Sequence, residues 1–148
     1  MNYTEQANKV IQTAKKIAKE RNHPYVGTEH LLLGLQKEIS GVAGQILSSN
    51  GVEEEKIWKV VEELVSPVGE EVPLGYPQIS PRLSYILEES KAEALRMRSD
   101  RIGTEHLLLA LLKDSDSVAA RILLTLNVNL QKLYQDILEV EGIDPKIY

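Results

Sequence analysis

Apolar residues recur along this chain at the three- and four-residue spacing of amphipathic helices. In segment 4–20 they form one face, at Ala7, Val10, Ile11, Ala14, Ile17 and Ala18. A second helical segment begins at residue 28 with a run of leucines, and a third covers about residues 41–50. A fourth carries Ile57, Val61 and Leu64. No segment shows the alternation typical of a half-buried strand, so the pattern predicts an all-α protein.

The helical pattern occurs twice. The run Gly-Thr-Glu-His-Leu-Leu-Leu-Gly-Leu at 27–35 returns as Gly-Thr-Glu-His-Leu-Leu-Leu-Ala-Leu at 103–111, a displacement of 103 − 27 = 76 positions. Segment 66–78 contains prolines and glycines, which interrupt helices, and is predicted to be a linker. We therefore expect one domain over residues 1–148, with eight helices in two pseudo-symmetric four-helix repeats at 3–65 and 79–141.

The ends of the predicted helices carry capping residues. Thr4 and its counterpart Ser80 are favourable N-caps, and Pro81 suits the first position of a helix. Gly51 and Asn127 follow the third helical segment of each repeat, and both residue types readily adopt the left-handed conformation that ends a helix. The two repeats therefore agree in their capping as well as in their apolar pattern.

The composition narrows the class of partner. The net charge is −5 and the pI is about 5.3, whereas nucleic-acid-binding domains usually present a strongly basic face. The absence of cysteine excludes disulfides and thiolate metal ligands and is consistent with a reducing compartment. No secretory signal is visible, and no apolar run reaches the roughly 18 residues of a membrane span. We expect a cytoplasmic protein that binds neither nucleic acid nor membrane.

The repeated Gly-Thr-Glu-His run contains the candidate functional residues. Thr28 is expected to cap the second helix, which places Glu29 in the first turn, where the helix dipole favours a carboxylate. That structural role explains Glu29 without a function. It explains less well why glutamate stands in both copies, at Glu29 and Glu105, while a surface position such as Asn22 has diverged to Arg98. The two glutamates are the strongest candidates for a binding site.

A structural role is favoured for the histidines. His30 and His106 each directly follow a glutamate, so the two side chains point about 100° apart and do not easily share a metal ion. We expect each histidine to pack under the leucines with a backbone partner. His23 has no counterpart, since Ser99 takes its place, and we predict no metal site.

The sequence contains no recognisable catalytic motif. It has neither a G-x-S-x-G nucleophile turn nor a G-x-x-x-x-G-K-[ST] phosphate loop, so we do not expect this chain to be an enzyme or to hydrolyse ATP. A hydrolase with one Glu/His pair in each repeat is an alternative, and it requires both side chains in an open cleft. The leucine run is expected to be core, with an exposed docking patch for partner helices as its alternative.

Several segments together resemble one known family. Tyr-Thr-Glu-Gln-Ala at 3–7 opens a helix, His-Pro-Tyr-Val and the first Gly-Thr-Glu-His run occupy 23–35, Val-Ala follows at 42–43, and the pattern repeats. Over nearly the whole chain this arrangement resembles the N-terminal repeat domain of the Clp AAA+ unfoldases, and it is most similar to the ClpC group of Gram-positive bacteria.

The resemblance implies a non-catalytic domain that receives substrates and adaptors such as MecA for a hexameric unfoldase working with the protease ClpP. ATP and Mg²⁺ would bind only in ATPase modules outside this sequence, the domain itself would carry no cofactor, and in isolation it would be a monomer. The resemblance also implies recognition of phosphoarginine at one pocket per repeat. Glu29 and Glu105 would hold the guanidinium, and Thr4 and Ser80 would help bind the phosphoryl group.

Such a ligand suits these residue types. Phosphoarginine joins a planar cation to an anion, so its receptor needs a carboxylate for paired hydrogen bonds and donors for the phosphoryl oxygens. Helix N-termini with hydroxyl caps supply such donors. The chain departs from the family pattern at Gln6, where relatives often carry arginine, and at Ser80, which replaces threonine. The alternative function is a free-standing Clp-repeat adaptor that docks partner helices without reading phosphoarginine.

Overall fold

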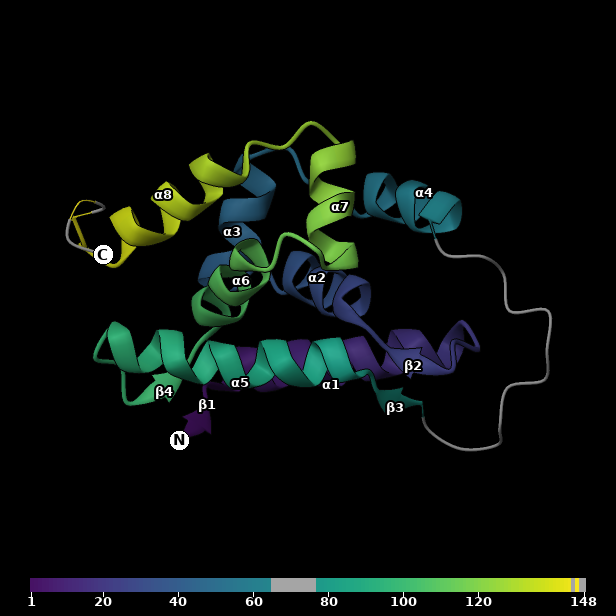
Figure 1. Ribbon diagram of the computed structural model, residues 1–148, viewed down its shortest axis with the longest axis horizontal. Coiled ribbons are helices and arrows are strands. Elements are labelled where there is room, and N and C mark those ends of the chain that lie inside the picture. The colour runs from purple at the N-terminus through teal and green to yellow at the C-terminus, as the bar shows by residue number, and fades with distance from the viewer. Residues whose placement is uncertain (65–76, 145, 147–148) are drawn as a thin grey trace.

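Eight helices follow one another along the described chain in the order that the hydrophobic pattern predicts (Figure 1). The computed structural model describes residues 1–64, 77–144 and 146. The first repeat supplies α1 (Glu5–Glu20), α2 (Thr28–Lys37), α3 (Val42–Ser49) and α4 (Glu54–Leu64). The second supplies α5 (Pro81–Arg96), α6 (Thr104–Lys113), α7 (Val118–Thr125) and α8 (Leu130–Val140). The all-α fold class is confirmed.

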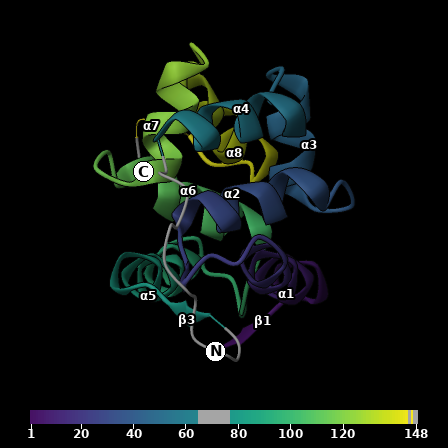
Figure 2. The same ribbon diagram turned by 90° about the vertical axis from the view of Figure 1, so that its right-hand side faces the viewer.

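The helices form three layers (Figures 1 and 2). The long helices α1 and α5 lie side by side in one outer layer, α2 and α6 cross the middle, and α3, α4, α7 and α8 form the opposite layer. The middle helices contact both repeats, since α2 packs against α1, α5 and α7, and α6 packs against α5, α1 and α3. The two repeats therefore share one core.

The leucine run of each repeat belongs to this core. A helix that is enclosed on all sides must be apolar around its whole circumference, and α2 and α6 are enclosed in this way. The eight leucines of the two runs are 0–1% exposed: Leu31, Leu32, Leu33, Leu35, Leu107, Leu108, Leu109 and Leu111. The prediction of core leucines is confirmed, and the alternative of a docking patch on them is wrong. Leu64 does not complete the buried face of α4, because it ends the helix and is 37% exposed.

Four two-residue strands tie the repeats together, and the sequence did not predict them. The strand β1 (Asn2–Tyr3) pairs in parallel with β4 (Arg101–Ile102), and β2 (Tyr25–Val26) pairs in parallel with β3 (Gln78–Ile79). Two residues are too few to show an alternating pattern. Each pair joins one repeat to the other, so each pairing sets the start of one repeat's long helix beside the start of the other repeat's middle helix.

The predicted helix ends are confirmed except at Thr28. The hydroxyls of Thr4 and Ser80 cap α1 and α5 by accepting hydrogen bonds from Ala7 N and Leu83 N, each at 3.1 Å. Positive φ angles of 77° at Gly51 and 60° at Asn127 end α3 and α7. The N-cap of α2 is Gly27 rather than Thr28, because the threonine hydroxyl is used elsewhere.

Two further sequence predictions concern the course of the chain. Most of the predicted linker 66–78 lies outside the described residues, and its last residue, Gln78, begins β3. Within the described ranges, every helix is too short or too polar to cross a lipid bilayer.

Candidate functional site

The threonines of the repeated run connect the two repeats. Thr28 Oγ1 accepts a hydrogen bond from Ala119 N at 3.1 Å, and Thr104 Oγ1 accepts one from Ala43 N at 3.2 Å. Ala119 and Ala43 are the second residues of α7 and α3, whose first backbone N–H groups have no acceptor within their own helix. Each threonine thus helps to cap a helix of the opposite repeat and fixes the start of its own helix against that repeat.

The histidines of the repeated run cap the N-termini of α2 and α6. Gly27 N donates to His30 Nδ1 and Gly103 N donates to His106 Nδ1, both at 2.8 Å. Each histidine is the third residue of its helix and so takes the place that Glu or Gln has in a capping box. The predicted structural role with a backbone partner is confirmed.

His30 makes a second contact that the sequence did not predict. Its Nε2 lies 2.7 Å from Nδ1 of His23. Burial, and next to it the charge of His23, together lower the pKa of His30 to about 4. Because Nδ1 accepts from Gly27 N, the neutral ring carries its proton on Nε2, which can donate to His23.

The carboxylate of Glu29 turns back over the start of its own helix. Its Oε1 occupies the space that a Cβ at residue 27 would need, and Glu105 Oε1 has the same relation to Gly103. Glu29 is only 9% exposed. Burial raises the pKa of Glu29, and a hydrogen bond from its own backbone opposes that shift. A side chain at residue 27 or 103 would therefore force the carboxylate of the glutamate two residues later to move.

A pocket of about 500 Å³ opens beside Glu29, and both repeats line it. The first repeat contributes Tyr25, Glu29 and His30, among others, and the second contributes Ser80, Arg82 and Ser117. The pairing of β2 with β3 and the hydrogen bond from Ser80 N to Val26 O, 3.0 Å long, bring the start of α5 to this place. The pocket therefore lies at the junction of the repeats.

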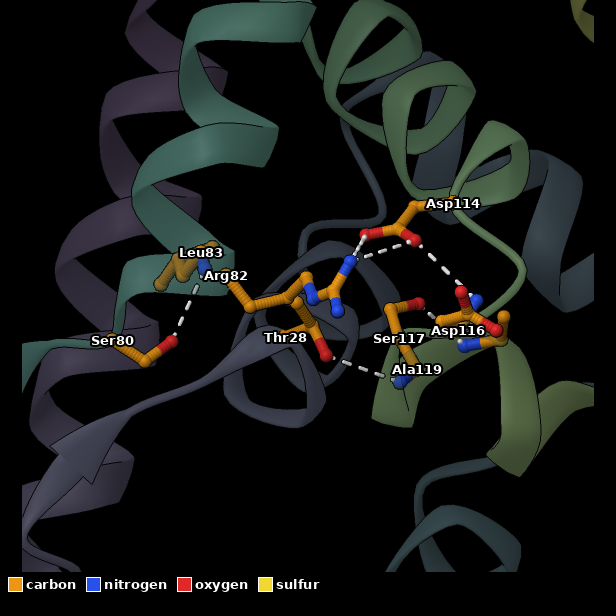
Figure 3. A network of polar contacts seen from close by, with 9 residues as sticks. Thr28, Ser80, Arg82, Leu83, Asp114, Asp116, Ser117 and Ala119 are labelled. Carbon is orange, nitrogen blue, oxygen red and sulfur yellow. Dashed lines mark hydrogen bonds and ion pairs between the residues drawn. The ribbon is translucent and has the colours of Figure 1, made fainter.

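Arg82 and Asp116, which line the pocket from the second repeat, are joined by a polar network through Asp114 (Figure 3). Arg82 Nη1 donates to Asp114 Oδ1 at 3.2 Å and to Oδ2 at 3.1 Å, and Asp116 N donates to Asp114 Oδ1 at 3.3 Å. Ser117 Oγ caps α7 by accepting from Ala120 N at 3.1 Å. The helix starts of α5 and α7 thus place an arginine and serine hydroxyls around one opening.

The second glutamate has different surroundings. Burial, a hydrogen bond to Glu141 and the negative charge of Glu141 together raise the pKa of Glu105 to about 7. Thr4 lies beside this helix start, because Thr4 N donates to Ile102 O at 2.9 Å. Thr4 is thus held beside the segment that leads into α6, as Ser80 is held beside the segment that leads into α2, but the Glu105 carboxylate has an acidic partner.

The structure pairs the predicted site residues across the repeats. We expected one pocket per repeat, and the Glu29 pocket is instead shared, since Glu29 comes from the first repeat and Ser80 from the second. The sequence analysis missed Arg82. The equivalent position in the first repeat is Gln6 (82 − 76 = 6), so the arginine is not repeated and did not stand out. The sequence analysis also missed His23, which was set aside because Ser99 replaces it in the second copy.

The geometry argues against the hydrolase alternative. Glu29 Oε1 lies 3.7 Å from His30 Nδ1, beyond hydrogen-bond distance, and Nδ1 already accepts from Gly27 N. The pair cannot pass a proton between its members in this arrangement. Among the residues that the structure describes, no group of three or more His, Cys, Asp or Glu side chains is placed to hold a metal ion.

Sequence comparisons point to one family. The family described as Clp repeat (R) N-terminal domain matches residues 2–126 and, in an overlapping second match, residues 78–147. The chaperone protein ClpB of Oceanobacillus iheyensis is 39% identical over 140 residues, which cover 95% of this chain and 17% of that protein. The ClpC subunit of Staphylococcus epidermidis, described as an ATP-dependent Clp protease ATP-binding subunit, is 37% identical over 139 residues, 94% of this chain and 17% of that protein.

Solved structures share the fold. The N-terminal domain of the chaperone ClpD from Arabidopsis thaliana has a TM-score of 0.75 and 25% identity, with 93% of this chain and 96% of that one covered. The ClpV N-domain, solved as a complex with a VipB peptide, has a TM-score of 0.74 and 22% identity, with 95% of this chain and 88% of that one covered. The second likeness is one of fold alone.

Proposed function

We propose, because the chain belongs to the Clp repeat (R) N-terminal domain family, that it recognises substrates and adaptors for a ClpC-type ATP-dependent unfoldase. The ClpC and ClpB relatives support this proposal over 94–95% of the chain. The ClpV N-domain, which has the same fold, is described in complex with a peptide, so a domain of this shape can hold a segment of another protein.

The proposed ligand at the Glu29 site is phosphoarginine on a marked protein. One observation carries this proposal: a carboxylate that is 9% exposed borders a pocket of about 500 Å³ whose other wall holds an arginine and a serine N-cap. A cationic group and an anionic group thus face one space. A ligand that joins a guanidinium to a phosphoryl group satisfies both.

Each group has a definite task in this proposal. The Glu29 carboxylate accepts paired hydrogen bonds from the guanidinium, which also removes the cost of leaving a buried carboxylate without a cation. The Ser80 oxygen already accepts from Leu83 N, so its hydroxyl proton can be donated to a phosphoryl oxygen. The proposal assigns the corresponding roles at the second site to Glu105 and Thr4.

Calorimetric titration tests the proposal directly. We expect free phosphoarginine to bind the wild-type domain, and the double variant Glu29→Ala/Glu105→Ala to show no binding heat. Phosphoserine, which lacks the guanidinium, should bind neither protein. The helical circular dichroism and the melting temperature of the double variant serve as folding controls and should stay near the wild-type values.

Two results would decide against phosphoarginine. Equal titration curves for the wild type and the double variant would remove the glutamates from the site. A wild type that binds a partner peptide but not phosphoarginine would favour the alternative of a helix-docking adaptor. That adaptor would need a surface other than the leucine runs, because all eight of their leucines are buried.

Membership of this family also supports proposals about cofactors, the partner protease, adaptors and location. We infer that ATP and Mg²⁺ act in ATPase modules outside this sequence, that the domain carries no cofactor, that ClpP is the associated protease, and that adaptors of the MecA type bind here. The chain spans 17% of the length of the ClpC and ClpB relatives, so these assignments concern the larger protein. A cytoplasmic location and a monomeric isolated domain are part of the same proposal.

A further inference from the structure

The two glutamate sites differ in the groups that surround the carboxylate. At the Glu29 site, α5 presents Arg82 as its second residue, and α7 begins at Ser117. The equivalent positions at the Glu105 site are Gln6 (82 − 76 = 6) and Gly41 (117 − 76 = 41). Gln6 carries no charge, and Gly41 has no hydroxyl. At these two positions the second site therefore offers neither the cation nor the hydroxyl group that the first site has.

Arg82 is placed to bind an anion in the pocket. Its side chain is 51% exposed, and among the described residues it bonds only to Asp114, through Nη1 (Figure 3). Nη2 and Nε can therefore donate to a ligand while Nη1 keeps its partner. Among the described residues that line the pocket, Arg82 is the one lysine or arginine side chain, and Asp116 is an acidic neighbour.

The surroundings of Glu105 oppose an anion. Glu141 hydrogen-bonds to Glu105, and its equivalent position in the first repeat is Val65 (141 − 76 = 65). A phosphoryl group brought to this site meets the carboxyl groups of Glu105 and Glu141 and the neutral Gln6. At the first site it also meets two carboxyl groups, of Glu29 and Asp116, but there Arg82 supplies a cation. Like charges at close range disfavour binding, and a charged donor strengthens a hydrogen bond to phosphate.

We propose that Arg82 makes the Glu29 site selective for phosphorylated over unmodified arginine, and that phosphoarginine fills this one site at concentrations that leave the Glu105 site empty. This inference rests on the proposed function, since it takes phosphoarginine as the ligand. The planar guanidinium of Arg82 binds two phosphoryl oxygens together, and the Ser80 hydroxyl donates to the phosphoryl group as well. The two sites are therefore unequal although the repeats are similar in sequence.

The test is a set of calorimetric titrations with free phosphoarginine and free arginine. Arg82→Gln places glutamine at the first site, as Gln6 is at the equivalent position of the second. Arg82→Lys keeps the positive charge but removes the planar guanidinium. We expect Arg82→Gln to weaken phosphoarginine binding about tenfold or more, with arginine binding changed less than about twofold, and Arg82→Lys to recover part of the loss. A merely structural role for Arg82 would weaken both ligands alike.

Single glutamate variants test the inequality of the sites. Glu29→Ala should abolish the high-affinity binding of phosphoarginine and leave only weaker binding at the Glu105 site. Glu105→Ala should remove that weaker binding, while the high-affinity step keeps a stoichiometry of one. The inference is overturned if Glu105→Ala halves the stoichiometry, or if Arg82→Gln leaves the preference for phosphoarginine intact. A wild type that binds no phosphoarginine at all overturns the proposed function instead, so the two failures are distinct.

Discussion

Thr28 Oγ1 accepts a hydrogen bond from the backbone N–H of Ala119, 91 positions away in the sequence and in the other repeat. The equivalent bond runs from Ala43 N to Thr104 Oγ1. Both threonines are buried, at 2% and 3% exposure, so water cannot replace the lost acceptor if the hydroxyl is removed. These two bonds tie the candidate site to the packing of the repeats.

Replacing Thr28 by valine should therefore destabilise the domain. Valine keeps the shape of the side chain but leaves Ala119 N without its acceptor, which costs about 1–3 kcal/mol for a buried donor. Urea denaturation measures the change in the free energy of unfolding. Thr28→Ser keeps the hydroxyl and is the matched control, and Thr104→Val should cost a similar amount. An unchanged denaturation midpoint for Thr28→Val would show that the bond contributes nothing.

Gly27→Ala should destabilise the domain because of Glu29. The φ of −106° at Gly27 suits alanine, so the backbone is not strained, but the new Cβ would overlap Glu29 Oε1. Displacing a buried carboxylate or the helix start should cost about 1–3 kcal/mol in unfolding free energy, as overpacking does. The melting temperature and a phosphoarginine titration measure the two consequences.

A double-mutant cycle isolates this contact. In the background of Glu29→Ala the carboxylate is gone, so Gly27→Ala should cost much less than it does in the wild type. Equal costs in the two backgrounds would mean that Glu29 does not dictate the glycine.

His30 should make the fold lose stability in mild acid. The pKa of His30 is lowered to about 4 in the folded state by burial, with the neighbouring His23 acting in the same direction, so folding favours the neutral ring. Its contribution is complete above the unfolded value of about 6.5 and is lost as the pH falls from 6.5 towards 4. The loss is on the order of 3 kcal/mol, at about 1.4 kcal/mol per pKa unit.

The matched variant for this prediction is His30→Gln. Glutamine at the third helix position can still accept from Gly27 N, as in a capping box, but it does not titrate. Urea denaturation between pH 7 and pH 4 should show a shallower loss of stability for the variant than for the wild type. Parallel pH profiles would show that His30 does not titrate with folding.

The Glu105–Glu141 pair should act in the opposite direction. Burial and Glu141 raise the pKa of Glu105 to about 7, so the folded state favours the protonated carboxyl group. Its stabilising contribution is complete below the unfolded value of about 4.5 and is lost as the pH rises through about 7.

Glu105→Gln, which stays neutral, is the test of this pair. The melting temperature of the variant minus that of the wild type should be larger at pH 8 than at pH 5. Glu141→Gln should change the pH profile in the same sense, because it lowers the pKa of Glu105. A wild type and variant with the same pH profile would remove the pair as the cause.

Much of the fold could be predicted because the determining interactions are local. The apolar spacing, the caps at Thr4 and Ser80 and the left-handed residues Gly51 and Asn127 act within a few residues of chain, and all of them appear as predicted. The four short strands could not be predicted, since two residues form no pattern and each strand is defined by a partner in the other repeat.

The sequence predicted some residues of the candidate site but not all of them. Duplication drew attention to Glu29 and Glu105, because a residue kept in both copies stands out against diverged neighbours. Arg82 was not predicted, because the other copy has Gln6 at the equivalent position and the arginine is therefore not repeated. The cap assigned to Thr28 was wrong because its hydroxyl serves α7, and no local rule reveals an acceptor that is 91 positions away.

The sequence by itself determined the helices, most of their ends, the doubled architecture and the two glutamates, since helix periodicity and capping depend mainly on nearby residues. The tertiary structure alone decided which residues meet. It set Ser80 and Arg82 of the second repeat beside Glu29 of the first, and it gave Glu105 an acidic neighbour in Glu141. The physical reason is that strand pairing and packing between the repeats join distant segments, so two nearly identical sequence runs acquire different electrostatic surroundings.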